Sequence, residues 1–139
     1  MSEAKIITSA QNPRIKAVAK LREKKGRDSQ KLFLIDGCRA LNFALKNHFP
    51  VSELYYCGKF FKPGEEKIIK AAQAKGLSVF NLNEKAFAKI AYGDNPDGIV
   101  AVARQQKKEL ADLPEGKSAL YLILDSVEKP GNLGAILRT

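Results

Sequence analysis

Apolar runs alternate with amphipathic stretches along residues 1–104, and this alternation limits the fold more than any other feature of the sequence. Apolar runs of four to eight residues between turn signals predict buried strands, and apolar residues at helical spacing predict helices between them. A strand–helix alternation indicates an α/β class protein. We therefore predict a three-layer α/β/α domain with a four-stranded sheet over residues 1–104. The predicted strands are residues 31–35, 51–57, 77–82 and 99–103.

The first predicted helix has clear end signals. Asn12 supplies a capping side chain and Pro13 fits the first helical position, so the helix begins there. Gly26 is expected to end it, after a helix over residues 13–25. Further helices are predicted over residues 39–47, from Pro63 to Gly76, and after Asn83.

The character of the chain changes after residue 104. Residues 105–118 are polar, with proline and glycine near their end, and are typical of an interdomain linker. Residues 119–124 are an apolar run that predicts the first strand of a new sheet, and residues 131–139 predict the start of a helix. Residues 119–139 are therefore expected to be the start of a second, truncated domain whose remainder lies beyond Thr139.

Positive charge is concentrated near the N-terminus. The chain has a net charge of +9, and residues 14–31 contain eight basic side chains against two acidic ones. Clustered cations attract phosphate and release counterions when they bind it. A membrane-surface helix would need a bulkier apolar face than Ile15, Val18 and Leu21 provide. The segment therefore favours nucleic acid over a membrane surface as the partner.

Specific side chains are predicted to contact phosphate. They are six basic residues of this segment, together with one arginine that starts the next helix. The predicted RNA-binding residues are Arg14, Lys16, Arg22, Lys24, Lys25, Arg27 and Arg39. The aromatic residues Phe60, Phe61 and Tyr92 are candidates for stacking on bases, but sequence does not separate them from core residues.

Other classes of function have little support in the sequence. The two cysteines, Cys38 and Cys57, lie too far apart and too far from His48 to suggest a metal site, so no metal is expected. No paired carboxylates or histidine cluster suggests a small-molecule enzyme. No apolar run reaches the ~18 residues that span a bilayer, and no signal peptide is evident. We expect a cytoplasmic protein with no membrane partner.

The C-terminal stretch contains a spaced set of polar residues. Gly134 allows close approach of a ligand or backbone, and Arg138 lies one helical turn later. A guanidinium there can bind a phosphate or lower the pKa of a hydroxyl. On spacing alone, a purely structural role is equally open, in which Asn132 caps the helix, Gly134 packs and Arg138 is solvated.

Three stretches carry a resemblance to a known family. The sequence "LDSVEKPGNLGAILRT" resembles the first motif of the SpoU (TrmH-type, SPOUT superfamily) RNA ribose methyltransferases. The stretches "SAQNPRIKAVAKLREKKGRDSQKLFLIDGCRAL" and "NPDGIVAVA" are similar to the N-terminal stretch and the closing strand of that family's substrate-binding domain. The family most often has Asp where this chain has Lys129, while Asn132, Gly134, Arg138 and Thr139 match.

The resemblance implies an RNA-binding domain like a ribosomal protein, followed by a knotted α/β domain that binds S-adenosylmethionine and forms a homodimer. It implies that Arg138 helps to activate a ribose 2′-hydroxyl, that Asn132 organises the site, and that Gly134 and Thr139 support the motif. The cofactor-binding residues would lie beyond residue 139. The expected function is 2′-O-ribose methylation of rRNA or tRNA by the full-length protein, with this fragment inactive alone. The alternative is a non-catalytic RNA-binding module related to ribosomal proteins.

Overall fold

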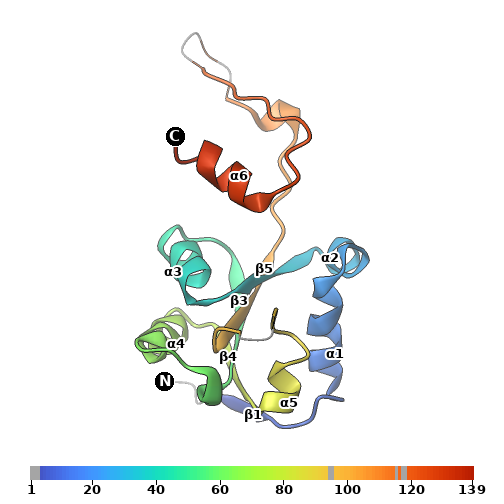
Figure 1. Cartoon of the computed structure of the whole chain (residues 1–139), viewed down its shortest axis with the longest axis vertical. Helices are drawn as coiled ribbons and strands as arrows, with labels where there is room; N and C mark the ends of the chain where they lie inside the picture. Colours follow the sequence, from blue (N-terminus) through green and yellow to red (C-terminus); the bar gives the residue numbers. More distant parts are fainter. Residues whose placement is uncertain (1–3, 94–95, 115, 117–118) are drawn as a thin grey trace. The chain divides into compact units, whose positions relative to one another are not determined.

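A mixed five-stranded sheet forms the centre of the first part of the chain. The computed structural model describes residues 4–93, 96–114, 116 and 119–139. The strand order is β1-β4-β3-β5-β2, with β1, β4 and β3 parallel and β5 antiparallel to both β3 and β2 (Figure 1). The strands are β1 Lys5–Ile7, β2 Leu32–Asp36, β3 Val51–Tyr56, β4 Ser78–Leu82 and β5 Ile99–Arg104.

The helices fall between these strands and after them. Three short segments, η1, η2 and η3, are 3-10 helices rather than α-helices. The elements are α1 Pro13–Ala19, η1 Lys20–Arg22, α2 Lys24–Gln30, α3 Cys38–Lys46, η2 Gly58–Phe60, α4 Glu65–Ala74, α5 Glu84–Phe87, η3 Leu110–Asp112 and α6 Pro130–Ile136. None of the helices in the described ranges is long and apolar enough to cross a membrane.

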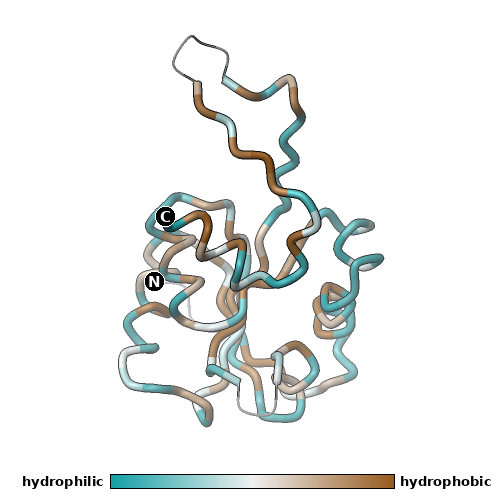
Figure 2. The backbone as a smooth tube through the Cα atoms, turned by 45° about the horizontal axis from the view of Figure 1, so that its top comes forward, coloured by the Kyte–Doolittle hydropathy of each residue, from teal (hydrophilic) through white to brown (hydrophobic). Residues whose placement is uncertain are grey.

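Helices cover both faces of the sheet, so the predicted three-layer α/β/α class is confirmed. In Figure 1, α3 and α4 lie on one side and α1, α2 and α5 on the other. Strand β5 is buried on both faces: Ile99 and Ala101 belong to the core under α3 and α4, while Val100 and Val102 belong to the core under α1 and α5. In Figure 2 the central strands carry hydrophobic stretches, drawn in brown.

The predicted sheet lacked one strand. Four of the five observed strands match the predicted runs to within one or two residues, but β1 was not expected. This strand is only three residues long, and its pairing is with β4, seventy-five positions later, at the edge of the sheet. A strand of three residues is too short to show an alternating pattern in the sequence, so it can be recognised only from its pairing with β4 in the folded sheet.

The first predicted helix is interrupted. Asn12 Oδ1 accepts a hydrogen bond from Arg14 N–H at 2.9 Å, and Pro13 occupies the first turn, as predicted. The helix then tightens into η1 and restarts as α2, so the prediction that Gly26 ends a helix over residues 13–25 is wrong. Gly26 lies inside α2, where a Cβ would be 1.9 Å from the carbonyl oxygen of Lys20. Glycine is therefore required by the close crossing of two helical turns.

The chain divides into two compact units, residues 1–106 and 107–139. In the second unit, α6 forms where a helix was predicted. The strand predicted over residues 119–124 does not form in the structure, and Leu120 and Ile123 are almost fully exposed. A strand needs a neighbour to pair its backbone groups, and the described residues of this unit provide none.

Candidate nucleic-acid interface

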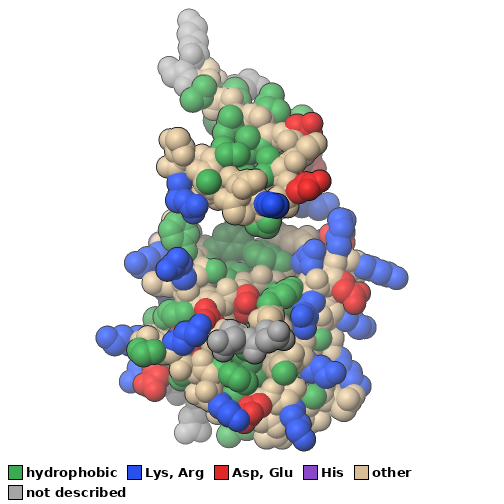
Figure 3. Space-filling model, in the orientation of Figure 1, with side chains coloured by type: hydrophobic (Ala, Val, Ile, Leu, Met, Phe, Trp, Pro, Cys, Tyr) green, Lys and Arg blue, Asp and Glu red, His purple; other side chains and the backbone are tan. Residues whose placement is uncertain are grey.

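The basic segment of residues 14–31 folds as α1, η1 and α2 on one face of the sheet. Ile15, Val18 and Leu21 are buried in the core beneath it, which turns the charged residues between them outward. Figure 3 shows Lys and Arg side chains along this side of the molecule and also over the opposite flank. We call the outward surface of α1, η1 and α2 the α1–α2 surface.

Three lysines of the α1–α2 surface are available to a ligand. The side chains of Lys16, Lys20 and Lys25 are exposed, and their ammonium groups make no hydrogen bond or ion pair with the part of the chain that the structure describes. Lys24 pairs with Asp28 at 2.6 Å, yet its side chain is 83% exposed. Surface pairs of this kind contribute little energy, so Lys24 can exchange its partner for a phosphate at small cost. These four lysines therefore place exposed positive charge on the α1–α2 surface.

An arginine of η1 lies over a tyrosine ring. The Arg22 guanidinium lies 4.9 Å from the ring centroid of Tyr92, which is 38% exposed. The two residues are seventy positions apart in sequence and come together only because residue 92 follows α5 on the same face of the sheet. Planar groups of this kind stack on nucleobases and bind phosphate.

Two of the predicted RNA-binding arginines are occupied by contacts within the protein. Arg14 forms an ion pair with Glu53 and lies 4.7 Å from the ring centroid of Phe80. Hydrogen bonding to Tyr55, and the charge of Glu53, raise the pKa of Arg14. Arg27 Nη1 donates to the carbonyl oxygens of Leu21 (3.2 Å) and Arg22 (2.8 Å). Both arginines hold the segment in place, and their charge adds to the local field.

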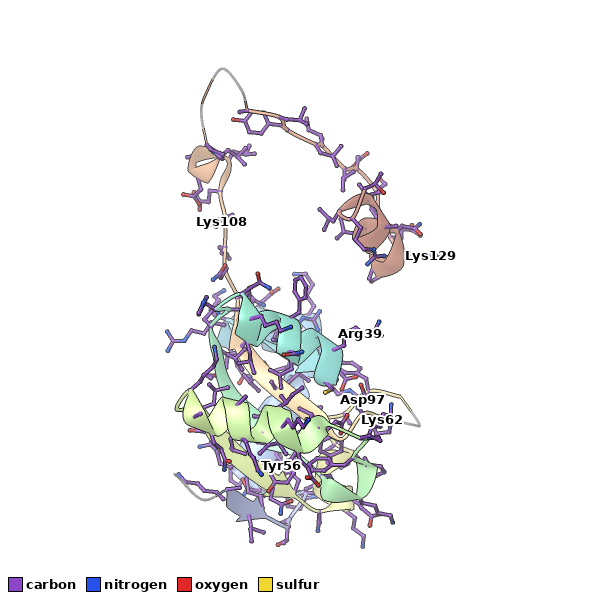
Figure 4. The ribbon with its side chains drawn as sticks, turned by 90° about the vertical axis from the view of Figure 1, so that its left-hand side faces the viewer. Arg39, Tyr56, Lys62, Asp97, Lys108 and Lys129 are labelled. Carbon is purple, nitrogen blue, oxygen red and sulfur yellow. The ribbon has the colours of Figure 1, made fainter. Side chains whose placement is uncertain are left out.

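A group of carboxylates lies where β2 ends and β5 begins. Burial, and then the charge of Asp97, raise the pKa of Asp36. Asp97 forms an ion pair with Lys62, and Figure 4 shows these two side chains close together with Arg39 nearby. Glu65 is 1% exposed, and its Oε2 accepts a hydrogen bond from Lys62 N–H at 3.2 Å.

In the described residues, no three His, Cys, Asp or Glu side chains are arranged to hold a metal ion.

The aromatic candidates separate once the fold is known. Phe60 packs against Phe87, with centroids 5.8 Å apart, and Phe61 packs against Tyr56 at 5.5 Å, so both belong to the cores. Only Tyr92 keeps an exposed ring among the three. The sequence-based selection missed Phe43, which is 72% exposed on α3. Phe43 lies between Leu41 and Leu45 and therefore off the buried side of the helix, which could have indicated from the sequence that its ring is exposed.

The C-terminal motif residues lie on α6 in the second unit. Asn132 is the third residue of the helix and Lys129 occupies the cap position, so Asn132 does not cap the helix. A Cβ on Gly134 would lie 3.5 Å from Arg138 Nη1, so the guanidinium folds back over Gly134. Thr139 Oγ1 donates to the Ala135 carbonyl oxygen at 3.2 Å.

Asn132 and Arg138 are not brought together in this unit. Asn132 lines a shallow hollow with residues 126–129 and Ile136, and Arg138 does not line it. The residues of the range 119–139 are almost all exposed, and none of their side chains has a buried polar atom without a partner. This unit therefore holds the motif residues without forming an enclosed site around them.

Comparison with known proteins identifies related molecules. The family model of the MRM3-like substrate binding domain matches residues 12–101. A tRNA/rRNA methyltransferase of Synechocystis, itself uncharacterised, is 32% identical over 99% of this chain and 49% of its own length. A 23S rRNA (guanosine(2553)-2′-O)-methyltransferase of Bacillus subtilis is 32% identical over 97% of this chain and 50% of its own. The chain thus spans about half the length of these relatives.

Solved structures agree with the sequence comparison. A crystal structure of an RNA 2′-O ribose methyltransferase has a TM-score of 0.73 and 38% identity, and covers 96% of this chain and 50% of that one. An AdoMet-bound rRNA methyltransferase from Sinorhizobium meliloti has a TM-score of 0.67 and 29% identity, over 81% of this chain and 41% of that one. Both carry the fold seen here.

Proposed function

This chain belongs to the MRM3-like substrate-binding domain family, and on that premise we propose that it captures rRNA or tRNA for a 2′-O-ribose methyltransferase. One observation carries the proposal: the residues that match the family model, 12–101, include the whole basic segment, residues 14–31, that forms the α1–α2 surface. Similarity to RNA methyltransferases along nearly the whole chain supports it. In this proposal residues 1–104 bind RNA, residues 105–118 link, and residues 119–139 supply the first catalytic motif.

The RNA-binding residues have two roles in this proposal. Lys16, Lys24 and Lys25 contact phosphates directly, because their ammonium groups are exposed on one surface. Arg22, stacked on Tyr92, offers a planar cation beside them. The remaining predicted residues are Arg14 and Arg27, which hold the segment through internal contacts, and Arg39, which lies on α3.

The catalytic proposal concerns α6. A guanidinium near a ribose 2′-hydroxyl stabilises the alkoxide that develops when the hydroxyl attacks, and Arg138 is proposed for that role. Asn132 is proposed to organise the site, although the two side chains do not meet in the described structure. S-adenosylmethionine is proposed as the methyl donor of the whole protein, supported by the AdoMet-bound relative. The residues described here do not fit that cofactor, because they form no enclosed site, so no step is derived through it. A homodimer and a cytoplasmic location are part of the same proposal.

The experiment that tests RNA binding is a salt titration of affinity. The triple variant Lys16→Ala/Lys24→Ala/Lys25→Ala is compared with the wild-type chain for binding to rRNA fragments and tRNA. Each lost phosphate contact reduces the slope of log K against log[salt] by roughly 0.7–0.9. We expect weaker binding and a slope smaller by about 2–3, for three contacts.

A matched control removes the same charge elsewhere. Lys5→Ala/Lys70→Ala/Lys85→Ala takes three exposed lysines from β1, α4 and α5. If net charge alone attracts RNA, the two triple variants will lose affinity equally, and the assignment to the α1–α2 surface is wrong. If neither variant changes affinity or slope, the proposal of electrostatic RNA capture fails.

Methyl transfer is expected to be absent from this chain alone. RNA incubated with residues 1–139 and labelled S-adenosylmethionine should bind the chain without gaining label, because the described residues form no enclosed cofactor site. A labelled 2′-O-methyl nucleotide in the RNA digest would contradict this expectation.

A further inference from the structure

The outer face of α3 presents an aromatic ring between two cations. Phe43 is 72% exposed, although phenylalanine is normally a core residue. Arg39 precedes it by four residues and Lys46 follows it by three, so all three lie on one side of the helix. Arg39, marked in Figure 4, lies on the solvent side of α3. The arrangement is separate from the α1–α2 surface, which lies on the other side of the sheet.

Core packing does not explain the position of Phe43. Leu41 and Leu45 supply the apolar side of α3 and are 0% and 7% exposed. Phe43 belongs to neither core cluster. Asn47 Nδ2 donates to the Phe43 carbonyl oxygen at 2.8 Å, which fixes the last turn of the helix beneath the ring. The ring is therefore held on a rigid element and left open to solvent.

The surroundings of the ring are basic. Residues 37–52 contain no Asp or Glu. A groove beside this face, between α3 and α4, is lined by Lys46, Lys67 and Lys75 and by no acidic residue. Lys75 Nζ donates to the Leu45 carbonyl oxygen at 3.0 Å, so that lysine is held at the groove. Charge complementarity thus favours a polyanion on this face.

We propose that the α3 face binds an unpaired stretch of RNA, with one base stacked on Phe43 and flanking phosphates on Arg39 and Lys46. The proposal rests on the proposed function and adds a second contact surface to it. Stacking on an aromatic side chain requires a base whose face is free, which single-stranded RNA offers and a duplex does not. An apolar protein partner would require a larger apolar patch, whereas this ring is flanked by Arg39, Asn42 and Lys46.

The test compares single-stranded RNA with a duplex of the same length. Phe43→Ala and Phe43→Leu remove the π face, and Phe43→Leu keeps an apolar side chain. Both should weaken binding of the single strand by roughly 5- to 150-fold. Phe43→Tyr keeps an aromatic ring and should bind the single strand with wild-type affinity. The affinity for the duplex should stay the same in all three variants. Ile6→Ala, which removes an apolar side chain that is 74% exposed on β1, is the control and should change neither affinity.

Several results would overturn the inference. Stacking is ruled out if Phe43→Leu binds the single strand like the wild type, or if it loses duplex and single-strand affinity equally. A change in self-association by sedimentation, with RNA affinity intact, would assign the face to a protein contact. If the Phe43 variants bind normally while the Lys16/Lys24/Lys25 variant is weak, only this inference fails. If that triple variant is also unaffected, the proposed function fails with it.

Discussion

At the scale of single residues, cations of the same segment have different roles because their surroundings differ. Arg14 and Lys16 are two residues apart on α1, yet Arg14 turns toward β3 and pairs with Glu53 while Lys16 stays in solvent. Tyr55 lies fully buried behind that pair, and burial, followed by its hydrogen bond to Glu53, holds the pKa of its hydroxyl well above its usual range. Stability and RNA binding should therefore separate between the two side chains.

The first prediction concerns this separation. Arg14→Ala leaves Glu53 and Tyr55 without their cation and should lower the free energy of unfolding by roughly 1–3 kcal/mol. Lys16→Ala should change it by less than about 0.5 kcal/mol, because it loses no internal contact. Urea unfolding at neutral pH measures both. Equal stabilities for the two variants would show that Arg14 is as free as Lys16.

A second prediction concerns the pH dependence of stability at Asp36. Its folded-state pKa is raised by burial and by Asp97, so the folded protein binds this proton more tightly than the unfolded chain. The stabilisation of the folded state by this proton is complete below the pKa of Asp36 in the unfolded chain. It is lost as pH rises through the pKa of Asp36 in the folded protein. Asp36→Asn should remove that loss and stabilise the protein at neutral pH, by less than about 1 kcal/mol because the group is only partly buried.

The matched comparison is Asp28, whose pKa shift has the opposite sign. Hydrogen bonding to Lys24 lowers the pKa of Asp28, so its contribution is present above the unfolded pKa and is lost as pH falls. Asp28→Asn should therefore flatten the acid side of the stability curve and give no gain at neutral pH. Thermal midpoints of both variants across the acid to neutral range measure this. The same pH profile in both variants would contradict the assignments.

At the scale of elements, the sequence pattern correctly predicted the helices and strands that depend on interactions between residues near in sequence. Buried strands β2 to β5 and the helix starts at Asn12 and Asn83 follow from apolar runs and capping side chains, and both caps form. Elements that depend on distant partners were not predicted correctly. Strand β1 exists because β4 pairs with it, and residues 119–124 remain unpaired because the described part of the second unit has no strand beside them.

The restart of the helix at α2 leads to the third prediction. A Cβ at Gly26 would lie 1.9 Å from the Lys20 carbonyl oxygen, so Gly26→Ala must push α2 away from η1. We expect a loss of about 1–3 kcal/mol, which is typical of overpacking. Gly58→Ala is the control, because nothing lies within 4 Å of the added Cβ. Thermal unfolding of the two variants gives the comparison, and a neutral Gly26→Ala would show that the crossing is loose.

At the scale of the whole chain, the candidate site was only partly predictable. Composition located the basic segment, because charge density is a property of the sequence alone. It did not reveal that Arg14 and Arg27 are used internally, since Glu53 and the Leu21 carbonyl meet them only after folding. The stack of Arg22 on Tyr92 and the exposure of Phe43 likewise depend on which face each element buries.

The fourth prediction concerns the independence of the first unit. Both hydrophobic cores are built from residues between Ala4 and Ala103, and the exposed apolar residues 119–124 belong to neither. A chain of residues 1–106 should therefore unfold within about 4 °C of the 139-residue chain, the shift that about 1 kcal/mol produces. Differential scanning calorimetry of both chains measures it. A larger loss would show that residues 107–139 stabilise the sheet.

The most direct test of RNA capture is to locate the RNA on the protein. RNA containing 4-thiouridine can be cross-linked to the 139-residue chain by light, and the modified peptides identified by mass spectrometry. We expect cross-links in residues 14–31 and at Tyr92, with Phe43 added when the RNA is single-stranded. Cross-links confined to β1, α5 or residues 107–139, or no cross-links at all, would contradict it.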